Sequence, residues 1–281
     1  MFEGVKRKLS KRKARRITQE YPYNVDSFNL TSEGKIEFAN WSNPLVKPVS
    51  IDQPLVDFFK KFIQKGDLVI DIGANIGDTT VPMALAAGAS GLTLGFDPNP
   101  LVYKILKKNA SLNPDKQRII PLQHAITVRE EEFFYVSSEA SFGNGGISST
   151  EKSHHGKFVY PEKIKGINLE QYLESNHPDQ VSKLTFIKVD AEGYDKEILK
   201  SISGLLKKHQ PFIIAESFGK SSASEKAELF DVVHKLGYEV FYFEDFHVDT
   251  SVIKITNGQE MSRWKKTMNI YCVPENRELH N

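Results

Sequence analysis

The sequence predicts an α/β protein in which helices cover both faces of a mostly parallel β-sheet. Between residues 68 and 273, short and almost continuous apolar runs alternate with segments of helical periodicity. Strands buried on both faces have this unbroken apolar character, and their alternation with helices is typical of parallel sheets. Several of these runs are followed directly by Asp or Gly. Because ligands bind at the carboxyl ends of such strands, we expect the functional residues there.

Seven apolar runs form the predicted sheet. They are residues 68–72, 92–96, 118–122, 184–189, 211–215, 239–243 and 268–273. A further peripheral strand is expected at 133–136. The helices begin at residues that suit N-termini, since Asp52, Asn99 and Asn168 each precede a helical pattern and can cap it.

The N-terminal region differs in charge from the rest of the chain. Residues 1–16 hold eight Lys and Arg against one Glu, a net +7, whereas the remaining 29 basic and 35 acidic residues give −6. Such an arm can be a solvated tail, bind an anionic membrane through Phe2, Val5 and Leu9 among its basic residues, or contact nucleic acid. Residues 28–38 suggest a short hairpin within an irregular extension, so we divide the chain into residues 1–50 and a main domain, 51–281.

Composition restricts the class and compartment of the protein. With 281 residues, 40% apolar and 26% charged, the chain has the make-up of a globular protein. Its single cysteine, Cys272, permits no internal disulfide. We find no apolar run long enough to span a bilayer and no signal-peptide pattern. These features favour a cytoplasmic location, with contact to a membrane surface as an additional prospect, and they leave the oligomeric state open.

The first strand runs into a glycine turn, Asp-Ile-Gly-Ala-Asn-Ile-Gly-Asp at residues 71–78. Gly73 and Gly77 permit a tight turn and close approach of a ligand to the backbone. A dinucleotide fingerprint needs glycines where this chain has Asn75 and Asp78. Together with Asp71, Asp78 disfavours a pyrophosphate and suits a cationic cofactor. S-adenosylmethionine (SAM), which carries a sulfonium and an ammonium, is therefore preferred over NAD.

The next two strand ends supply most of the remaining residues predicted to bind the cofactor, and Asp190, after the fourth strand, completes the set. Asp97, followed by Pro98, lies 20 residues beyond Gly77, a spacing that suits an acid accepting hydrogen bonds from ribose hydroxyls. Residues 123–125, which are Gln123, His124 and Ala125, follow the third strand and are expected at the adenine edge.

The fourth strand carries a lysine in a buried setting. Lys188, Asp190 and Glu192 alternate onto one side of the extended chain, and Glu216 follows the fifth strand. A buried lysine needs a partner, so a structural ion pair is one interpretation. The other is a polar cluster that orients a substrate and takes its proton.

Residues 137–166 interrupt the alternation with a stretch rich in Ser, Gly, Asn and His. Structureless loops of this length are uncommon in compact domains unless they have a function. We expect this loop to cover the acceptor through Phe142, Asn144, Ser148 and Tyr160. A metal is not predicted, because the pair at 154–155 lacks carboxylate or cysteine partners at ligand spacing.

The motifs at 69–77 and 187–193, with Glu216 after a fifth strand, resemble the FkbM family of methyltransferases, over roughly residues 52–274. Residues 144–149 also resemble a small-residue loop of that family. The resemblance implies a Rossmann-like class I methyltransferase fold, SAM as cofactor, and O-methylation of a sugar hydroxyl in a polysaccharide, glycolipid or natural product. It leaves residues 1–50 unexplained.

In the predicted reaction, Asp190 or Glu192 is the first candidate for general base and Glu216 the second, while Lys188 holds these carboxylates or acts as base itself. Two alternatives remain: an RNA methyltransferase that uses the basic arm, and an NAD-dependent sugar-modifying enzyme.

Overall fold

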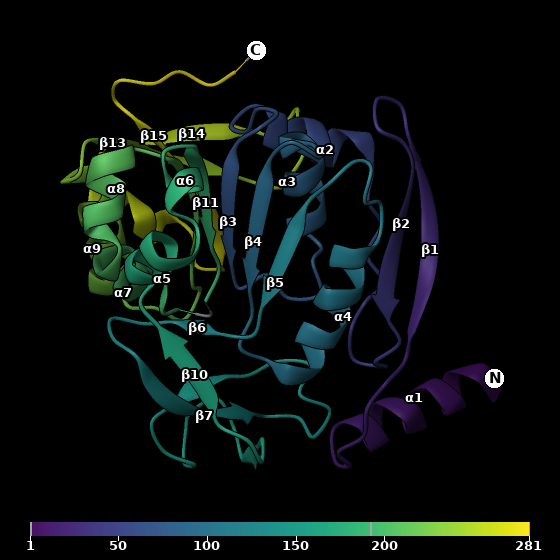
Figure 1. Ribbon diagram of the computed structural model, residues 1–281. Coiled ribbons are helices and arrows are strands. Elements are labelled where there is room, and N and C mark those ends of the chain that lie inside the picture. The colour runs from purple at the N-terminus through teal and green to yellow at the C-terminus, as the bar shows by residue number, and fades with distance from the viewer. Residues whose placement is uncertain (1, 192, 281) are drawn as a thin grey trace.

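The computed structural model describes residues 2–191 and 193–280, with side chains from residue 4 onward. A large twisted sheet forms its centre, a small sheet lies below it, and α1 (Phe2–Ala14) projects to one side (Figure 1). Glu192, one of the candidate bases, lies outside the described residues.

Within the described residues, the large sheet has eight strands. Their order is β14 (Val252–Ile255), β13 (Tyr238–Phe243), β15 (Met268–Pro274), β12 (Phe212–Ser217), β11 (Leu184–Val189), β3 (Leu68–Ile72), β4 (Leu92–Phe96) and β5 (Ile119–Leu122). The strands from β12 to β5 are parallel, whereas β15 is antiparallel to both of its neighbours and β14 is antiparallel to β13. This confirms the predicted α/β fold of class I methyltransferases with its seven strands. Strand β14 was not predicted, because its four residues are mostly exposed and lack a buried apolar run.

Alternate residues of the central strands pack on opposite sides of the sheet. On one side, Val69 and Phe186 contact the aromatic residues of α2. On the other, Ile70 and Ile187 pack against α7, α8 and α9. Burial on both sides explains why these strands have no polar alternation. Besides α1, the helices of the described chain are α2 (Gln53–Lys60), α3 (Thr80–Ala87), α4 (Pro100–Ser111), α5 (Leu169–Asn176), α6 (Pro178–Val181), α7 (Asp195–Ser201), α8 (Ser203–His209), α9 (Ala223–His234) and the 3-10 helix η1 (Gly258–Arg263).

The three predicted N-caps are confirmed. The side chains of Asp52, Asn99 and Asn168 accept hydrogen bonds from backbone amides in the first turns of α2, α4 and α5. Asn99 also donates to the carbonyl of Phe142 at 2.7 Å, so this cap connects the large sheet with the segment below it.

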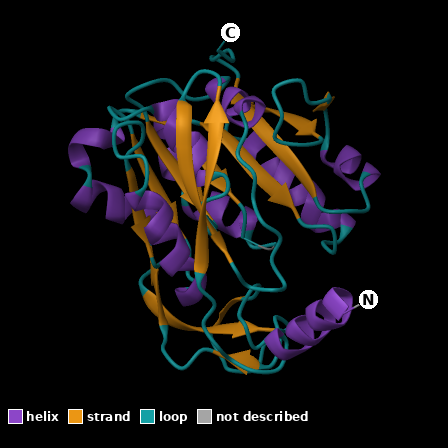
Figure 2. Cartoon of the chain, turned by 90° about the vertical axis from the view of Figure 1, so that its right-hand side faces the viewer, coloured by secondary structure: helices purple, strands orange, loops and turns teal. Residues whose placement is uncertain are grey.

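Residues 137–166 were expected to be a loop, and this expectation is wrong in part. They contribute to a small mixed sheet made of β6 (Ala125–Ile126), β7 (Glu131–Ser137), β8 (Gly146–Ser148), β9 (Phe158–Val159) and β10 (Ile164–Ile167). The strands after β7 are only two to four residues long, which is too short to produce a periodic pattern in the sequence. Figure 2 shows this sheet across the lower end of the molecule.

The N-terminal region is more ordered than its sequence suggests. The predicted hairpin is confirmed and longer than expected, with β1 (Tyr23–Leu30) and β2 (Gly34–Trp41) in antiparallel register. Ile36 and Phe38 are fully buried against the same cluster as α3 and α4. Asn109 of α4 accepts from the amide of Ala39 at 2.6 Å and donates to the carbonyl of Ile76 at 2.7 Å. In the described part of the chain, we find no helix long and apolar enough to cross a bilayer.

Candidate active site

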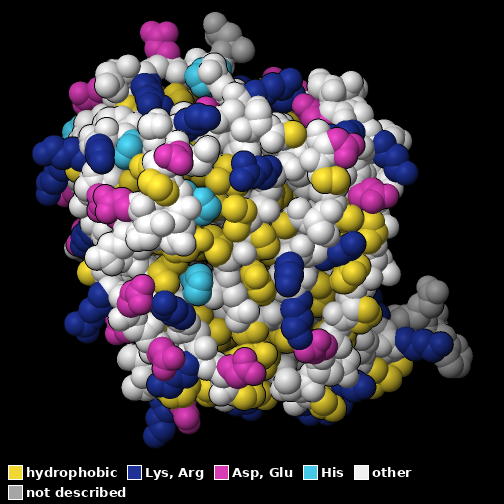
Figure 3. All heavy atoms as spheres, viewed as in Figure 1, with side chains coloured by type: hydrophobic (Ala, Val, Ile, Leu, Met, Phe, Trp, Pro, Cys, Tyr) yellow, Lys and Arg dark blue, Asp and Glu magenta, His cyan; other side chains and the backbone are white. Residues whose placement is uncertain are grey.

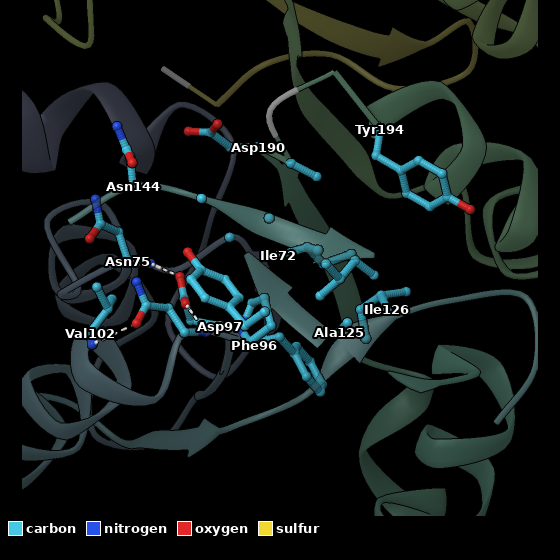
Figure 4. Close-up of a pocket in the computed structure, with 18 of the residues that line it drawn as sticks. Ile72, Asn75, Phe96, Asp97, Val102, Ala125, Ile126, Asn144, Asp190 and Tyr194 are labelled. Carbon is cyan, nitrogen blue, oxygen red and sulfur yellow. Dashed lines mark hydrogen bonds between the residues drawn. The ribbon is translucent and has the colours of Figure 1, made fainter. Parts of the chain in front are cut away.

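A cavity of about 680 Å³ lies at the carboxyl ends of β3, β4, β11 and β12, and the small sheet closes its other side. Figure 4 shows residues from both walls directed into it, including Asn75 and Asp97 from the large sheet and Asn144 from the small-sheet segment. The predicted residues that line it are Gly73, Asn75, Asp78, Asp97, Pro98, His124, Ala125, Asn144, Ser148, Lys188, Asp190 and Glu216. Their roles toward ligands stay predictions.

The glycine turn after β3 depends on Gly73. Its φ is +80°, and a Cβ atom there would lie 1.8 Å from the carbonyl oxygen of Asp190. The amides of Gly73 and Ala74 both donate to the carbonyl of Phe96 at 2.9 Å. The absence of a side chain therefore lets the ends of β3, β4 and β11 meet closely. Gly77 does not line the cavity and instead packs against α4, where a Cβ would lie 3.3 Å from Leu106.

Asp97 is held in one orientation by two backbone amides. Its Oδ2 accepts from Asn75 N and its Oδ1 from Asn99 N, both at 2.8 Å (Figure 4). The residue is 8% exposed, and burial raises the pKa of its carboxyl group to about 7, although both amides oppose the shift. Each carboxylate oxygen keeps a lone pair for a further donor, so Asp97 is suited to accept hydrogen bonds from hydroxyl groups of a ribose.

Asp71 was predicted to bind the cofactor, but the structure places it behind the cavity wall. It is fully buried, and its Oδ2 accepts from Thr80 Oγ1 at 2.6 Å and Thr79 Oγ1 at 3.2 Å. Asp71 and Lys188 are direct register partners on β3 and β11. Register partners on adjacent strands present their side chains on the same side of the sheet, so Asp71 faces Lys188.

Lys188 bridges two carboxylates. Its Nζ lies 3.4 Å from Asp71 Oδ1 and 3.2 Å from Asp190 Oδ2. Burial by itself lowers the pKa of this ammonium, but the charges of Asp190, Asp71 and Asp78 outweigh it and raise the pKa. The neighbouring carboxylates therefore favour the charged form of Lys188, which donates a hydrogen bond to Asp190. The Asp190 side chain is 41% exposed, whereas that of Lys188 is 4% exposed, so Asp190 is the member of the pair open to a ligand.

The charge of the cavity fits SAM better than a dinucleotide. Asp78, Asp97 and Asp190 all line it, and Lys188 is already paired with Asp71 and Asp190. Burial raises the pKa of Asp78 to about 6 even though the charge of Lys188 opposes the shift, so acidic charge in this space is costly. A sulfonium or ammonium relieves that cost, whereas phosphates increase it.

Asp195, at the start of α7, was missed by the sequence analysis. It is 2% exposed, its Oδ1 accepts from Glu216 N at 3.1 Å, and its Oδ2 accepts from Gly193 N at 3.3 Å. Burial raises the pKa of its carboxyl group to about 7. Asp195 thus joins the segment after β11 to the end of β12. An acid in the first turn of a helix that follows a functional strand was the available signal.

Phe142, Tyr160 and Gln123 were predicted to contact ligands, but none of them lines the cavity. Phe142 is 2% exposed and meets the half-buried ring of Tyr160 edge-on, with ring centroids 5.7 Å apart. His124 does line the cavity, and burial lowers the pKa of its imidazole. Lining aromatic residues that the sequence analysis missed include Phe133, Tyr135 and Tyr194.

In the part of the chain that the structure describes, no group of three or more His, Cys, Asp or Glu side chains is arranged to hold a metal ion. His154 and His155 do line the cavity, and their rings contact each other with centroids 4.0 Å apart.

The sheet order, with a cavity at the strand ends, is the architecture of class I methyltransferases. The model of the methyltransferase FkbM domain matches residues 71–240, which span both the glycine turn and the Lys188–Asp190 pair. The chain belongs to this family of SAM-dependent methyltransferases.

Two curated relatives are similar to the chain. The hexuronic acid methyltransferase AglP of Haloferax volcanii is 26% identical over 165 residues, which cover 59% of this chain and 62% of the relative. The methyltransferase sdnD of Sordaria araneosa is 25% identical over 155 residues, covering 48% of this chain and 60% of the relative. The chain thus matches about three fifths of the length of each relative.

Solved structures with a similar fold include two methyltransferases. One is the methyltransferase FkbM from Methylobacillus flagellatus, with 13% identity and a TM-score of 0.44 over 75% of this chain and 44% of that one. The other is a SAM-dependent O-methyltransferase from Thermotoga maritima, with 11% identity and a TM-score of 0.43 over 90% of this chain and 78% of that one.

Proposed function

We propose that this methyltransferase transfers the methyl group of SAM to a hydroxyl group of a sugar. The observation that carries the proposal is the extent of the cavity. It runs from Gly73 and Asp97 past Asp190 to Tyr194 and to the small-sheet residues 143–149. The nucleoside would use the part beside Asp97, which leaves the part between Asp190 and the small sheet for an acceptor.

The acceptor part of the cavity has the chemistry of a sugar site. Tyr194 is 44% exposed, so its ring offers an open face against which a sugar can stack. Asn144 and Ser148, on the opposite wall, supply amide and hydroxyl groups suited to sugar hydroxyls. The similarity to a relative named for methylation of a hexuronic acid supports the same class of acceptor.

Asp97 and the backbone at Gly73 would hold SAM, with Asp78 near its positive charge. When bound, SAM supplies a methyl group on a cationic sulfur, and its transfer to the acceptor oxygen leaves S-adenosylhomocysteine and one proton. Asp190 would take that proton, and two observations support this role: the residue lines the cavity, and Lys188 donates a hydrogen bond to its carboxylate. General-base assistance of this kind contributes about 10²–10⁴-fold to a rate. Glu216, beside the same space, is the second candidate.

A turnover assay tests the proposal directly. Purified protein and labelled SAM are incubated with uronic acids, neutral glycans, lipid-linked sugars and RNA, and the product is identified by mass spectrometry. We expect a methyl ether on a sugar hydroxyl. Methylation of RNA alone, or methyl groups attached to nitrogen or carbon, would refute the assignment.

The roles of the two carboxylates are separated by substitution. Asp190→Asn is expected to lower kcat by about 10²–10⁴-fold with little change in the affinity for SAM, since it removes a proton acceptor. Glu216→Gln should have a smaller effect. If Asp190→Asn retains full turnover and Glu216→Gln does not, the order of the two candidates is reversed.

A further inference from the structure

Helix α1 has almost no packing partner on its own chain. Every residue from 4 to 10 is exposed, and within the helix from Gly4 onward only Ala14 is buried. Figures 1 and 2 show the helix projecting sideways from the small-sheet end of the molecule. Isolated helices of about 12–15 residues are marginal in water. A helix of 13 residues that buries so little is therefore expected to gain stability from an external surface.

The outward side of α1 combines aliphatic and basic residues. At about 100° per residue, Val5 lies opposite the buried Ala14, and Leu9 lies about 40° from Val5. Val5 is 54% and Leu9 60% exposed. Arg12 and Lys13 flank this pair on either side. The part of α1 that projects from the body carries basic side chains in the space-filling view (Figure 3).

We propose that α1 binds the surface of an anionic phospholipid bilayer, with Val5 and Leu9 in the interface and the surrounding Lys and Arg side chains on the headgroups. A short basic helix with an aliphatic strip on its outward face is suited to this position. The strip favours a bilayer over nucleic acid, because a phosphodiester backbone offers the basic residues a partner but leaves Val5 and Leu9 in water.

The end of α1 is attached to the wall of the cavity. The carbonyl of Arg15 accepts from the amide of Ala140 at 3.3 Å, and its guanidinium lies 3.8 Å from Glu139 Oε1. The same loop continues into Gly143 and Asn144, which line the cavity. A bilayer bound by α1 would thus lie near the segment that closes the active site.

The test is sedimentation of the full chain with vesicles of phosphatidylcholine alone, or of phosphatidylcholine and phosphatidylglycerol in equal parts. We expect binding to the anionic vesicles only, weakened by salt. Loss of each basic residue near such a surface lowers the partition coefficient about fivefold, so Arg12→Gln/Lys13→Gln should lower it about 25-fold. Val5→Ala/Leu9→Ala should lower it at least about tenfold, because it removes aliphatic groups from the interface.

The control is Lys207→Gln/Lys208→Gln, which removes the same charge from exposed positions at the end of α8 and should leave vesicle binding unchanged. Thermal unfolding of all three variants should match the parent, since Val5, Arg12 and Lys13 are exposed. The proposal is overturned if vesicles of both compositions bind equally or not at all. It is also overturned if Val5→Ala/Leu9→Ala binds anionic vesicles like the parent, and RNA binding that needs Arg12 and Lys13 but not Leu9 would instead assign α1 to nucleic acid.

Discussion

At the scale of single residues, this active site depends on how each carboxylate is held. Asp97 is fixed by two amides, and Asp190 by Lys188. Asp71, by contrast, has no place on the cavity wall and serves as the second anion of Lys188. These three aspartates at neighbouring strand ends thus have different environments. We therefore expect a different effect from substitution of each one.

Replacing Asp97 by Asn should weaken the binding of SAM without unfolding the protein. The change removes the charge that accepts hydrogen bonds from ribose, and hydrogen bonds to charged groups contribute about 1.5–3 kcal/mol each. We expect Kd for SAM to rise about 10- to 100-fold in titration calorimetry. Asp231→Asn, an exposed position on α9, is the matched control and should bind like the parent. Unchanged affinity in Asp97→Asn would remove Asp97 from the cofactor site.

The affinity for SAM should also depend on pH. Burial raises the pKa of Asp97 to about 7 and that of Asp78 to about 6, so both carboxyl groups become protonated as the pH falls toward about 5. A cationic ligand prefers their ionised forms. We therefore expect Kd to increase as pH falls below about 7, by up to about tenfold per pH unit for each group. Titration calorimetry between about pH 5 and 8 measures how Kd for SAM changes with pH. In Asp97→Asn, Kd should no longer depend on pH above about pH 6.

At the scale of elements, the junction of the glycine turn with β11 is the most restrictive contact. A methyl group at position 73 has to displace the Asp190 carbonyl, and it also imposes a left-handed backbone on a residue with a side chain. Gly237 has a similar φ of +81°, but a Cβ at that position would have no atom within 4 Å. Both positions have the left-handed backbone, but only Gly73 also has a close contact. Comparing substitutions at the two glycines therefore distinguishes the effect of backbone strain from the effect of the contact with Asp190.

Gly73→Ala should lower both stability and turnover, whereas Gly237→Ala should lower stability only. Strain from the left-handed conformation costs about 1–2 kcal/mol in each variant. The clash in Gly73→Ala adds to this and shifts Asp190 away from its position. Chemical denaturation and kcat measured together check the prediction. Equal losses of stability with normal turnover in both variants would show that the contact with Asp190 does not matter.

The sequence was sufficient for the elements whose patterns are local. Apolar runs and capping residues located the strands and helices of the large sheet, and the convergence of strand ends located Gly73, Asp97 and Asp190. Asp71 could not be assigned in this way, because its partner depends on the register between β3 and β11. Phe142 and Tyr160 were misassigned for a related reason: packing between distant short strands decides whether a loop aromatic faces a ligand or the core.

At the scale of the whole molecule, the N-terminal region has two parts with different relations to the core. The helix α1 is exposed, whereas the β1–β2 hairpin shares a buried cluster with α3 and α4. The division of the chain at residue 50 therefore remains a prediction that truncation can test.

Removal of residues 1–16 should leave the melting temperature nearly unchanged. Removal of residues 1–50 should abolish or strongly weaken folding, because it exposes the surface of α3 and α4 that Ile36, Phe38 and Trp41 cover and removes Ala39, which exchanges two hydrogen bonds with Asn109. Unsatisfied buried polar groups alone cost about 1–3 kcal/mol each. Differential scanning calorimetry of both truncated chains checks this. A stable, cooperative fold for residues 51–281 would establish that the hairpin is an accessory.

The two walls of the cavity come from different parts of the chain, and this division has a consequence for engineering. The wall that we propose for the nucleoside is formed by strand ends of the central sheet, whereas the opposite wall includes residues 143–149, which contain β8 and the residues on either side of it. Exchanging residues 143–149 is therefore expected to change which acceptor binds without changing the affinity for SAM. Donor and acceptor recognition would then be open to separate redesign.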